Sequence, residues 1–262
     1  MALAALRFRP YVSSRRPAHA TMPQVPPVKT LCVLQHTEAE YLGLLEDHLE
    51  SRSVRFRYFR PFTKGGTLPV DEEEYDGLML LGGGPYGVVS GPLLASLAPE
   101  MRVARRFLES GRPVVGFGIG AILLAVAAGG GAEEAPLRFE VGEARREDAA
   151  PLAAMLPERF AYASYLRDLP VLPEGAEILA RDPAGDPLVF AIGGNSFGFV
   201  CHPGIKSAMV EDLIMEFDEA PENTAELLDK LRSEQAGIAE ALSAIMVGMV
   251  RQCGWMDATV SD

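Results

Sequence analysis

The chain has 262 residues, which is enough for one large domain or for one domain with an appendage. Hydrophobic residues make up 48% of it and the net charge is −12. Such a chain can bury a sizeable core, and a body of this charge repels nucleic acid and anionic membranes. No apolar run approaches the ~18 residues of a membrane span. We therefore expect a protein that acts on neither nucleic acid nor membrane.

The first 28 residues differ in composition from the rest of the chain. They contain four arginines and no acid, together with several alanines and prolines. This composition resembles an organelle transit peptide, whereas Met22 offers an alternative start just before a proline-rich stretch. We expect residues 1–28 to be a disordered leader or the product of a start codon placed too far upstream, and the organelle is the less favoured interpretation.

From residue 30 onwards, short apolar runs alternate with amphipathic segments. The pattern predicts strands at 30–35, 54–60, 76–81 and 112–115, and helices at 40–52, 99–110 and 121–125. Glycine-rich turns follow two of these strands, at 82–84 and 116–120. This order is typical of a flavodoxin-like, doubly wound, mainly parallel α/β sheet, in which ligands bind beyond the carboxyl ends of the strands.

The second half of the chain predicts further strands and one long helix. The strands are expected at 137–143, 177–180, 188–192 and 197–201. A two-row apolar stripe over 223–250 predicts a helix that packs on its own domain, with a partner or dimer helix as the alternative. We therefore divide the chain into a leader (1–28), an α/β domain (29–222) and a C-terminal helical extension (223–262).

Residues 116–120 (Gly-Phe-Gly-Ile-Gly) are typical of an elbow that presents a catalytic nucleophile. A buried strand enters the tight turn and an apolar helix leaves it. The residue at the apex is Gly118, which has no side chain that could attack a substrate. Glycine also tolerates the positive φ that such a turn requires, so the turn can persist without its catalytic purpose.

Four segments in this order resemble the class I glutamine amidotransferase family, whose glutaminase domain uses a Cys-His-Glu triad. They correspond to the family's oxyanion loop, elbow, Leu-Pro-Glu-Gly strand entry and His-Pro-Glu segment, and they lie at 80–85, 116–125, 172–180 and 199–204. Each motif alone is weak, but four in the right order on the right element types indicate the fold. The resemblance covers roughly residues 30 to 205.

The resemblance implies a triad that is incomplete in this chain. In the family the cysteine attacks the glutamine amide, the histidine takes its proton and the glutamate orients the histidine. The matching residues here are Gly118, His202 and Gly204. The family's substrate-holding glutamine corresponds to Ile122, so nucleophile, orienting carboxylate and a substrate ligand are all missing.

The backbone features of the site are better retained than its side chains. The N–H groups of Gly83, Gly84 and Ile119 are expected to form an oxyanion-type nest at a helix N-terminus. Residues expected to line the pocket are Ile122, Ser164, Tyr165 and His36. The acidic run at 71–74 is typical of a solvated loop, and neither a metal-ligand spacing nor a cofactor motif is present.

The cysteines offer no obvious replacement for the missing nucleophile. Cys201 directly precedes His202 on a predicted strand, so the two side chains should point to opposite faces. Cys32 lies within the first predicted strand, and Cys253 lies near the end of the chain. Three scattered cysteines form no disulfide framework, which favours a reducing, cytoplasmic compartment.

These features favour a glutamine amidotransferase-like protein without glutaminase activity that acts as a binding, assembly or regulatory subunit. The alternative is an enzyme of the same fold, an amide or γ-glutamyl hydrolase or amidotransferase, that uses another nucleophile or a partner subunit. The resemblance implies a protein partner, either a synthase-type subunit or a second copy. A small carboxylate or amide is the expected ligand.

Overall fold

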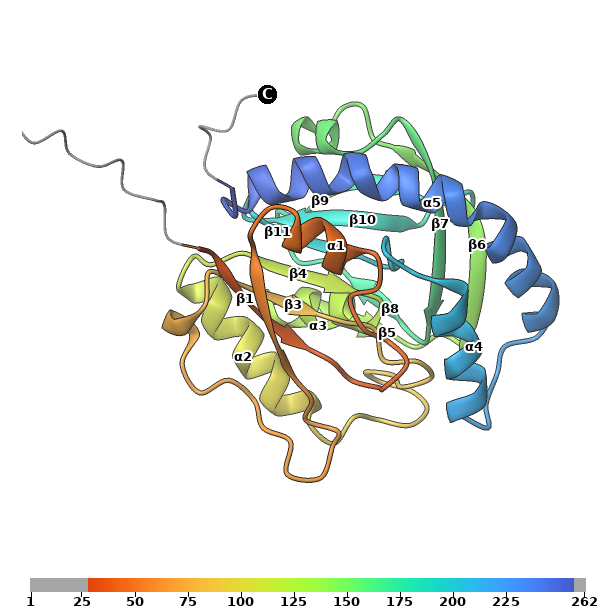
Figure 1. The fold of residues 1–262 in the computed structure, drawn as a ribbon, viewed down its shortest axis with the longest axis horizontal. Coiled ribbons are helices and arrows are strands. Elements are labelled where there is room, and N and C mark those ends of the chain that lie inside the picture. The colour runs from red at the N-terminus through yellow and green to blue at the C-terminus, as the bar shows by residue number, and fades with distance from the viewer. Residues whose placement is uncertain (1–27, 257–262) are drawn as a thin grey trace, which may run out of the picture.

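A nine-stranded sheet with the order β2-β1-β3-β4-β11-β10-β9-β6-β7 forms the centre of the structure (Figure 1). The structure is a computed structural model and describes residues 28–256. The leader expected for residues 1–28 therefore lies, apart from Val28, outside the described residues. Within 28–256, no helix is both long and apolar enough to cross a bilayer.

Five neighbouring strands run parallel, as the pattern of short apolar runs predicts. They are β2 (Arg55–Phe59), β1 (Thr30–Leu34), β3 (Gly77–Leu80), β4 (Val114–Phe117) and β11 (Ser196–Phe199). Every residue of β3, β4 and β11 is buried, because layers of helix and chain cover both faces of the sheet. The predicted flavodoxin-like α/β class is confirmed.

Helices cover the two faces of this parallel half. On one face, α2 (Leu97–Glu109) packs against α3 (Ile119–Ala127), and both contact β3 and β4. The short helix α1 (Leu45–Glu50) lies on the other face and contacts α5 (Thr224–Gln252). The strand order reverses between β1 and β3, so the carboxyl ends of these strands flank the position where doubly wound sheets bind their ligands.

The other half of the sheet is antiparallel. Its strands are β10 (Pro187–Ile192), β9 (Glu177–Arg181), β6 (Arg138–Arg146) and β7 (Arg159–Leu166). A two-stranded sheet joins β5 (Gly131–Glu133) to β8 (Leu169–Val171), and short 3₁₀ turns span Glu72–Glu74 and Pro151–Met155. The N–H of His202 donates to the carbonyl of Ala163 at 3.1 Å, which brings β7 beside the segment that follows β11.

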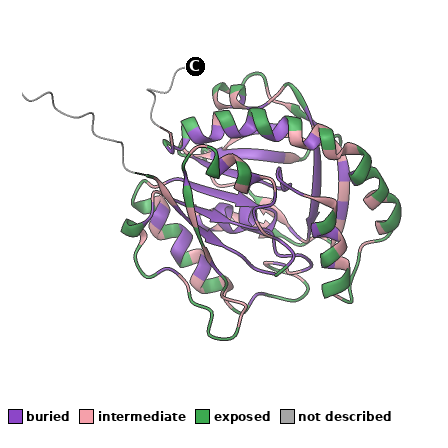
Figure 2. Cartoon of the chain, viewed as in Figure 1, coloured by how far each residue is buried: buried purple, intermediate pink, exposed green. Residues whose placement is uncertain are grey.

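The long helix α5 packs on its own chain. It contacts β6, β7 and α4 (Ser207–Glu216), and in Figure 2 its inward side is buried while its outward side is exposed. Beyond the helix, Trp255 is 2% exposed, and its indole N–H donates to the carbonyl of Asp76 at 3.2 Å. The ring also packs over Gly77, where an added Cβ would lie 2.8 Å from Nε1. The end of α5 is thereby fastened to the start of β3.

Several local differences separate the structure from the sequence prediction. The helix predicted over 40–52 forms only over Leu45–Glu50, because residues 41–44 turn to pack on the segment around Gly204. The strands β5, β7 and β8 and the helix α4 were not predicted. Almost every position along β7 is at least partly buried, so the strand lacks the strict alternation that would have identified it.

Candidate functional site

The turn between β4 and α3 places Gly118 at its apex with φ 54° and ψ −122°. Its neighbours are glycines for steric reasons. A Cβ at Gly116 would lie 2.2 Å from the carbonyl oxygen of Gly120, and one at Gly120 would lie 2.2 Å from that of Leu80. At Gly118 itself, the nearest atom to an added Cβ is the Cα of Gly82, at 3.5 Å. The apex therefore has room for a side chain that the chain does not supply.

The glycine loop after β3 holds a carboxylate that belongs to the chain itself. The N–H of Gly84 donates to Oε2 of Glu40, a residue of the loop after β1 that is 4% exposed. The other carboxylate oxygen lies so close to Gly82 that an added Cβ there would approach it to 1.8 Å. Burial raises the pKa of Glu40 to about 7, although the Gly84 N–H and the charge of His36 oppose this shift.

A buried ion pair between His36 and Glu100 contacts the backbone of this glycine loop. The Nδ1 of His36 lies 2.9 Å from the carbonyl of Leu81 and 3.0 Å from that of Gly82, and its Nε2 lies 2.7 Å from Oε2 of Glu100. Both ring nitrogens face acceptors, so the ring is the imidazolium cation. Burial alone would lower the pKa of His36, but the charge and hydrogen bond of Glu100, the carbonyl of Gly82 and the charge of Glu40 together raise it. His36 in turn holds the pKa of Glu100 below its ordinary value, against the effect of burial.

The imidazole of His202 is held by the backbone at both nitrogens. Its Nε2 donates to the carbonyl of Tyr41 at 3.0 Å, and its Nδ1 accepts from the N–H of Gly204 at 3.2 Å. The ring packs against Phe117 with centroids 5.4 Å apart, and burial lowers the pKa of His202 to about 4. His202 is therefore a neutral, fully bonded ring that must break a backbone contact before it can take up a proton.

The segment 41–45 fills the space beside Gly204. A Cβ at Gly204 would lie 2.4 Å from Cδ1 of Leu45 and 2.9 Å from the carbonyl oxygen of Leu42. The carbonyl of Gly204 accepts from the N–H of Leu44 at 3.0 Å, and Gly43, with φ 63°, packs against the same carbonyl. A glutamate at position 204 would have no room unless this segment moved.

We expect His202 to make the protein less stable in mild acid. The unfolded chain takes up a proton near the ordinary pKa of 6.5, whereas the folded chain resists until about pH 4, so this contribution is lost as the pH falls between those values. Between pH 7 and pH 5 the loss amounts to about 2 kcal/mol. Urea unfolding of the wild type and of His202→Gln, which retains a donor to Tyr41, measures it. A stability difference between the two proteins that is the same at both pH values would contradict this.

The remaining predicted site residues are buried either in α3 or on β7. Ile119 and Ile122 are buried in α3, and the Cγ2 of Ile119 lies against Gly83. Ser164 and Tyr165 are buried on β7, where the hydroxyl of Tyr165 donates to the carbonyl of Glu219 at 3.5 Å. Burial raises the pKa of Tyr165 to about 12, and the charge of Glu40 adds to this effect.

The cysteines are poor nucleophiles because they are buried in apolar surroundings. Burial raises the pKa of the Cys32 and Cys201 thiols to about 12, and it also raises the pKa of Cys253. A thiolate is the reactive form of cysteine, and it is strongly disfavoured at each of these positions near neutral pH.

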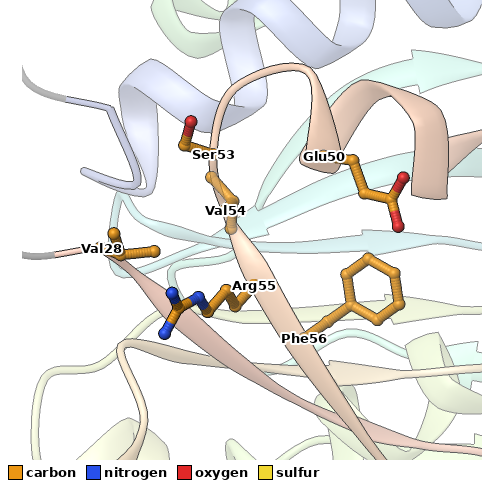
Figure 3. A pocket seen from close by; sticks show the side chains of 6 residues that line it. All are labelled: Val28, Glu50, Ser53, Val54, Arg55 and Phe56. Atoms are coloured by element: carbon orange, nitrogen blue, oxygen red, sulfur yellow. The ribbon is translucent and has the colours of Figure 1, made fainter.

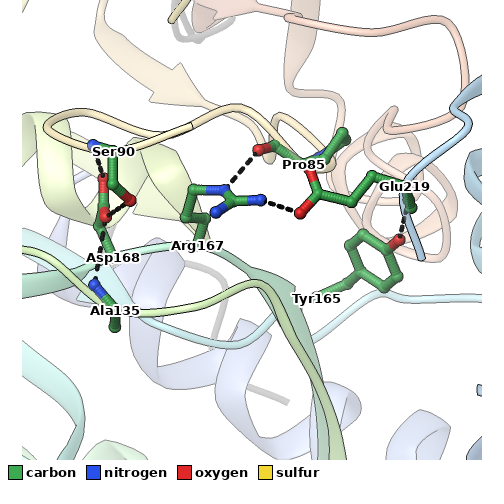
Figure 4. A network of polar contacts seen from close by, with 7 residues as sticks. All are labelled: Pro85, Ser90, Ala135, Tyr165, Arg167, Asp168 and Glu219. Carbon is green, nitrogen blue, oxygen red and sulfur yellow. Dashed lines mark hydrogen bonds and ion pairs between the residues drawn. The ribbon is translucent and has the colours of Figure 1, made fainter. Parts of the chain in front are cut away.

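Sequence reasoning also missed a polar network that anchors the loop between β3 and α2 (Figure 4). The carboxylate of Asp168 accepts from four backbone N–H groups at 2.7–3.3 Å and from the Ser90 hydroxyl, and these N–H groups belong to Val88, Val89, Ser90 and Ala135. Arg167 donates to the carbonyl of Pro85 at 3.1 Å and pairs with Glu219. The glycine loop is thus held at its far end.

Four surface pockets of 520–600 Å³ lie away from the elbow. Figure 3 shows one beside β2, lined by Val28, Glu50, Ser53, Val54, Arg55 and Phe56. None of these four is lined by Gly118, Gly84 or His202. Within residues 28–256, no three His, Cys, Asp or Glu side chains gather where they could hold a metal ion.

The fold has close counterparts among solved structures, although the sequence matches no family model and no curated protein. A glutamine amidotransferase from Methylobacillus flagellatus aligns with a TM-score of 0.74 and 20% identity over 86% of this chain and 96% of its own. A glutamine amidotransferase from Thermotoga maritima aligns with a TM-score of 0.70 and 20% identity, over 87% of this chain and 99% of its own. A protein from Thermoplasma acidophilum, described as a putative GMP synthase subunit, aligns with a TM-score of 0.52 and 15% identity, over 80% of this chain and 98% of its own. The chain therefore has the fold of the glutamine amidotransferases.

Proposed function

We propose that this protein is a class I glutamine amidotransferase-like subunit that does not hydrolyse glutamine and that acts by binding, assembly or regulation. The observation that carries the proposal is the combination of a bare elbow with a bonded histidine. Gly118 offers no nucleophile, and both ring nitrogens of His202 are used by the backbone. Amide hydrolysis by this fold needs both groups free to react.

The orienting carboxylate cannot be restored by a small rearrangement. Leu45 and the carbonyl of Leu42 occupy the space that a side chain at Gly204 would need. The N–H of Gly84 is already bound to Glu40. The nucleophile is therefore absent, and the base and one of the three expected oxyanion donors are engaged. Groups that act as a unit lose their effect together.

A partner protein is the second part of the proposal. One of the similar structures is described as a subunit of GMP synthase, which supports a subunit role for a chain of this fold. The partner is a synthase-type subunit or a second copy of this chain, and the site of action is the cytoplasm. This role requires the docking surface of the fold and makes no use of the elbow.

The expected result of a glutaminase assay is no release of ammonia. The wild type should release none from glutamine, alone or with partners that co-purify with it. Gly118→Cys should also release none, because His202 remains bonded and Gly204 remains filled. Gly118→Ala serves as the matched control for the strain of a side chain at φ 54°.

Two outcomes would count against the proposal. Ammonia release by the wild type would show that another residue supplies the nucleophile. Release by Gly118→Cys alone would show that His202 leaves its backbone partners readily and acts as a base. Both assays need circular dichroism of the same samples, so that loss of folding is not mistaken for lack of chemistry.

A further inference from the structure

The strand β2 forms one edge of the nine-stranded sheet, so one side of its backbone has no neighbouring strand (Figure 1). The N–H of Arg55 donates to the carbonyl of Lys29 at 2.8 Å, in register with β1. Since alternate residues of a strand turn their backbone groups to opposite sides, those of Phe56 and Tyr58 point away from β1. Within residues 28–256, no backbone hydrogen bond outside the β1–β2 pair engages them. An open edge of this kind is a template for a further strand.

The segment that contains β2 is basic in an otherwise acidic chain. Between residues 51 and 70 there are five cations and no acid, although the whole chain has a net charge of −12. The five cations are Arg52, Arg55, Arg57, Arg60 and Lys64. In the described part of the chain, none of them forms an ion pair with a carboxylate, and all except Arg52 are exposed. The edge therefore carries positive charge that the described chain does not neutralise.

Aromatic rings hold two of these arginines along the strand. The guanidinium of Arg57 lies 5.0 Å from the centre of the Phe59 ring, and that of Arg60 lies 5.2 Å from the centre of the Tyr58 ring. A guanidinium that stacks on a ring is ordered and still presents N–H donors in the plane of the group. These arginines are thus prepared for a carboxylate.

The two faces of β2 differ in their chemistry. Arg55 and Arg57 are exposed on one face, whereas Phe56 and Tyr58 are partly buried on the other. The pocket in Figure 3, of about 590 Å³, lies beside the start of the strand, and Phe56 and Val28 give it apolar walls. A strand added to this edge would therefore place every second side chain beside the arginines and the others beside Phe56.

A second copy of β2 does not fit this edge. Two such strands side by side would bring arginines close to arginines, and like charges on facing strands are destabilising. Charges on an edge strand protect a sheet from pairing with itself in this way. An acidic strand, by contrast, is attracted here, while the acidic remainder of the chain repels it and so favours this one surface.

We propose that β2 is a docking edge for an extended acidic segment of a partner protein, which adds to the sheet as a further strand with its carboxylates beside Arg55 and Arg57. This inference rests on the proposed function, because it gives the partner named there a surface and a chemistry. It makes no use of the elbow, so the two proposals can fail separately.

The probe is a fluorescein-labelled peptide of alternating glutamate and valine, whose binding to the full chain is followed by fluorescence anisotropy. We expect binding that weakens as sodium chloride is added, and no binding when lysine replaces glutamate in the peptide. The double variant Arg55→Glu, Arg57→Glu should bind at least about tenfold more weakly, because two attractions become repulsions.

The matched control is the double variant Arg102→Glu, Arg251→Glu, which changes the net charge equally. Both of these arginines are exposed, on α2 and α5, and neither has an ion pair within 28–256. The control should bind the peptide nearly as well as the wild type. No binding by the wild type, or an equal loss in the two double variants, would overturn the inference.

Amide hydrogen exchange distinguishes strand pairing from attraction of charges alone. The peptide should slow exchange at the amides of Phe56 and Tyr58, which face the open edge, and leave that of Arg55, already bonded to Lys29, unchanged. Binding without this protection would overturn the inference, and the measurement on the wild type decides should the arginine variant fail to fold. Ammonia release from glutamine, by contrast, would overturn only the proposed function.

Discussion

Replacement of Glu100 by alanine lowers the free energy of unfolding by about 3–5 kcal/mol, because it leaves the cation of His36 buried without its partner. The two side chains are fully buried and meet at 2.7 Å. The ring also donates to the carbonyls of Leu81 and Gly82, so loss of Glu100 loosens the glycine loop as well. Urea denaturation followed by circular dichroism measures the change.

Glu109→Ala is the control on the same helix. Its carboxylate pairs with Arg105 at 3.1 Å, but both side chains are about two-thirds exposed. Exposed pairs contribute little, so we expect a change within about 0.5 kcal/mol. If Glu100→Ala cost no more than this control, the ring of His36 would be neutral in the folded protein, and the buried ion pair described above would not exist.

Replacement of Asp168 by alanine lowers the free energy of unfolding by about 3 kcal/mol, because several backbone donors lose their common acceptor. The donors belong to residues 88–90 and 135, and the Asp168 side chain that accepts from them is buried. The substitution should also increase the rate of amide hydrogen exchange, and this increase should be larger at Val88 and Val89 than at residues of the central strands. Denaturation and exchange together measure the global and local parts of this effect.

Two further variants make the Asp168 experiment specific. Asp168→Asn keeps a side chain that tolerates φ 63° but replaces one acceptor oxygen by a donor, so an intermediate loss is expected. Asp148→Ala removes an exposed carboxylate that pairs with Arg146 and should change little. Unchanged exchange at Val88 in Asp168→Ala would mean that other contacts anchor the loop.

The sequence predicts the fold well because the signals for the fold are local. Glycines at 82–84 and 116–120 follow apolar runs directly, and the structure places both turns at the carboxyl ends of β3 and β4. The hairpin between β10 and β11 is equally local, with positive φ at Gly193 and Gly194. Such features require no knowledge of distant parts of the chain.

The contents of the site depend on contacts that the sequence does not display. The sequence pattern places Glu40 in a helix, and Glu100 lies near the start of another, where acids usually face solvent. Each carboxylate is buried beside a partner that is distant in the sequence. Glu40 accepts from the N–H of Gly84, and Glu100 pairs with His36. A motif identifies His202, but the motif does not reveal that Tyr41 and Gly204 engage its ring.

The attachment of Trp255 to Asp76 and Gly77 has a practical consequence. Trp255 is the only tryptophan of the chain, and its indole is buried at the junction of the C-terminal segment with β3. Fluorescence that is excited at wavelengths where tryptophan absorbs and tyrosine does not therefore comes from this one residue. A spectral change that precedes the loss of helical signal would report detachment of this end before the sheet itself opens.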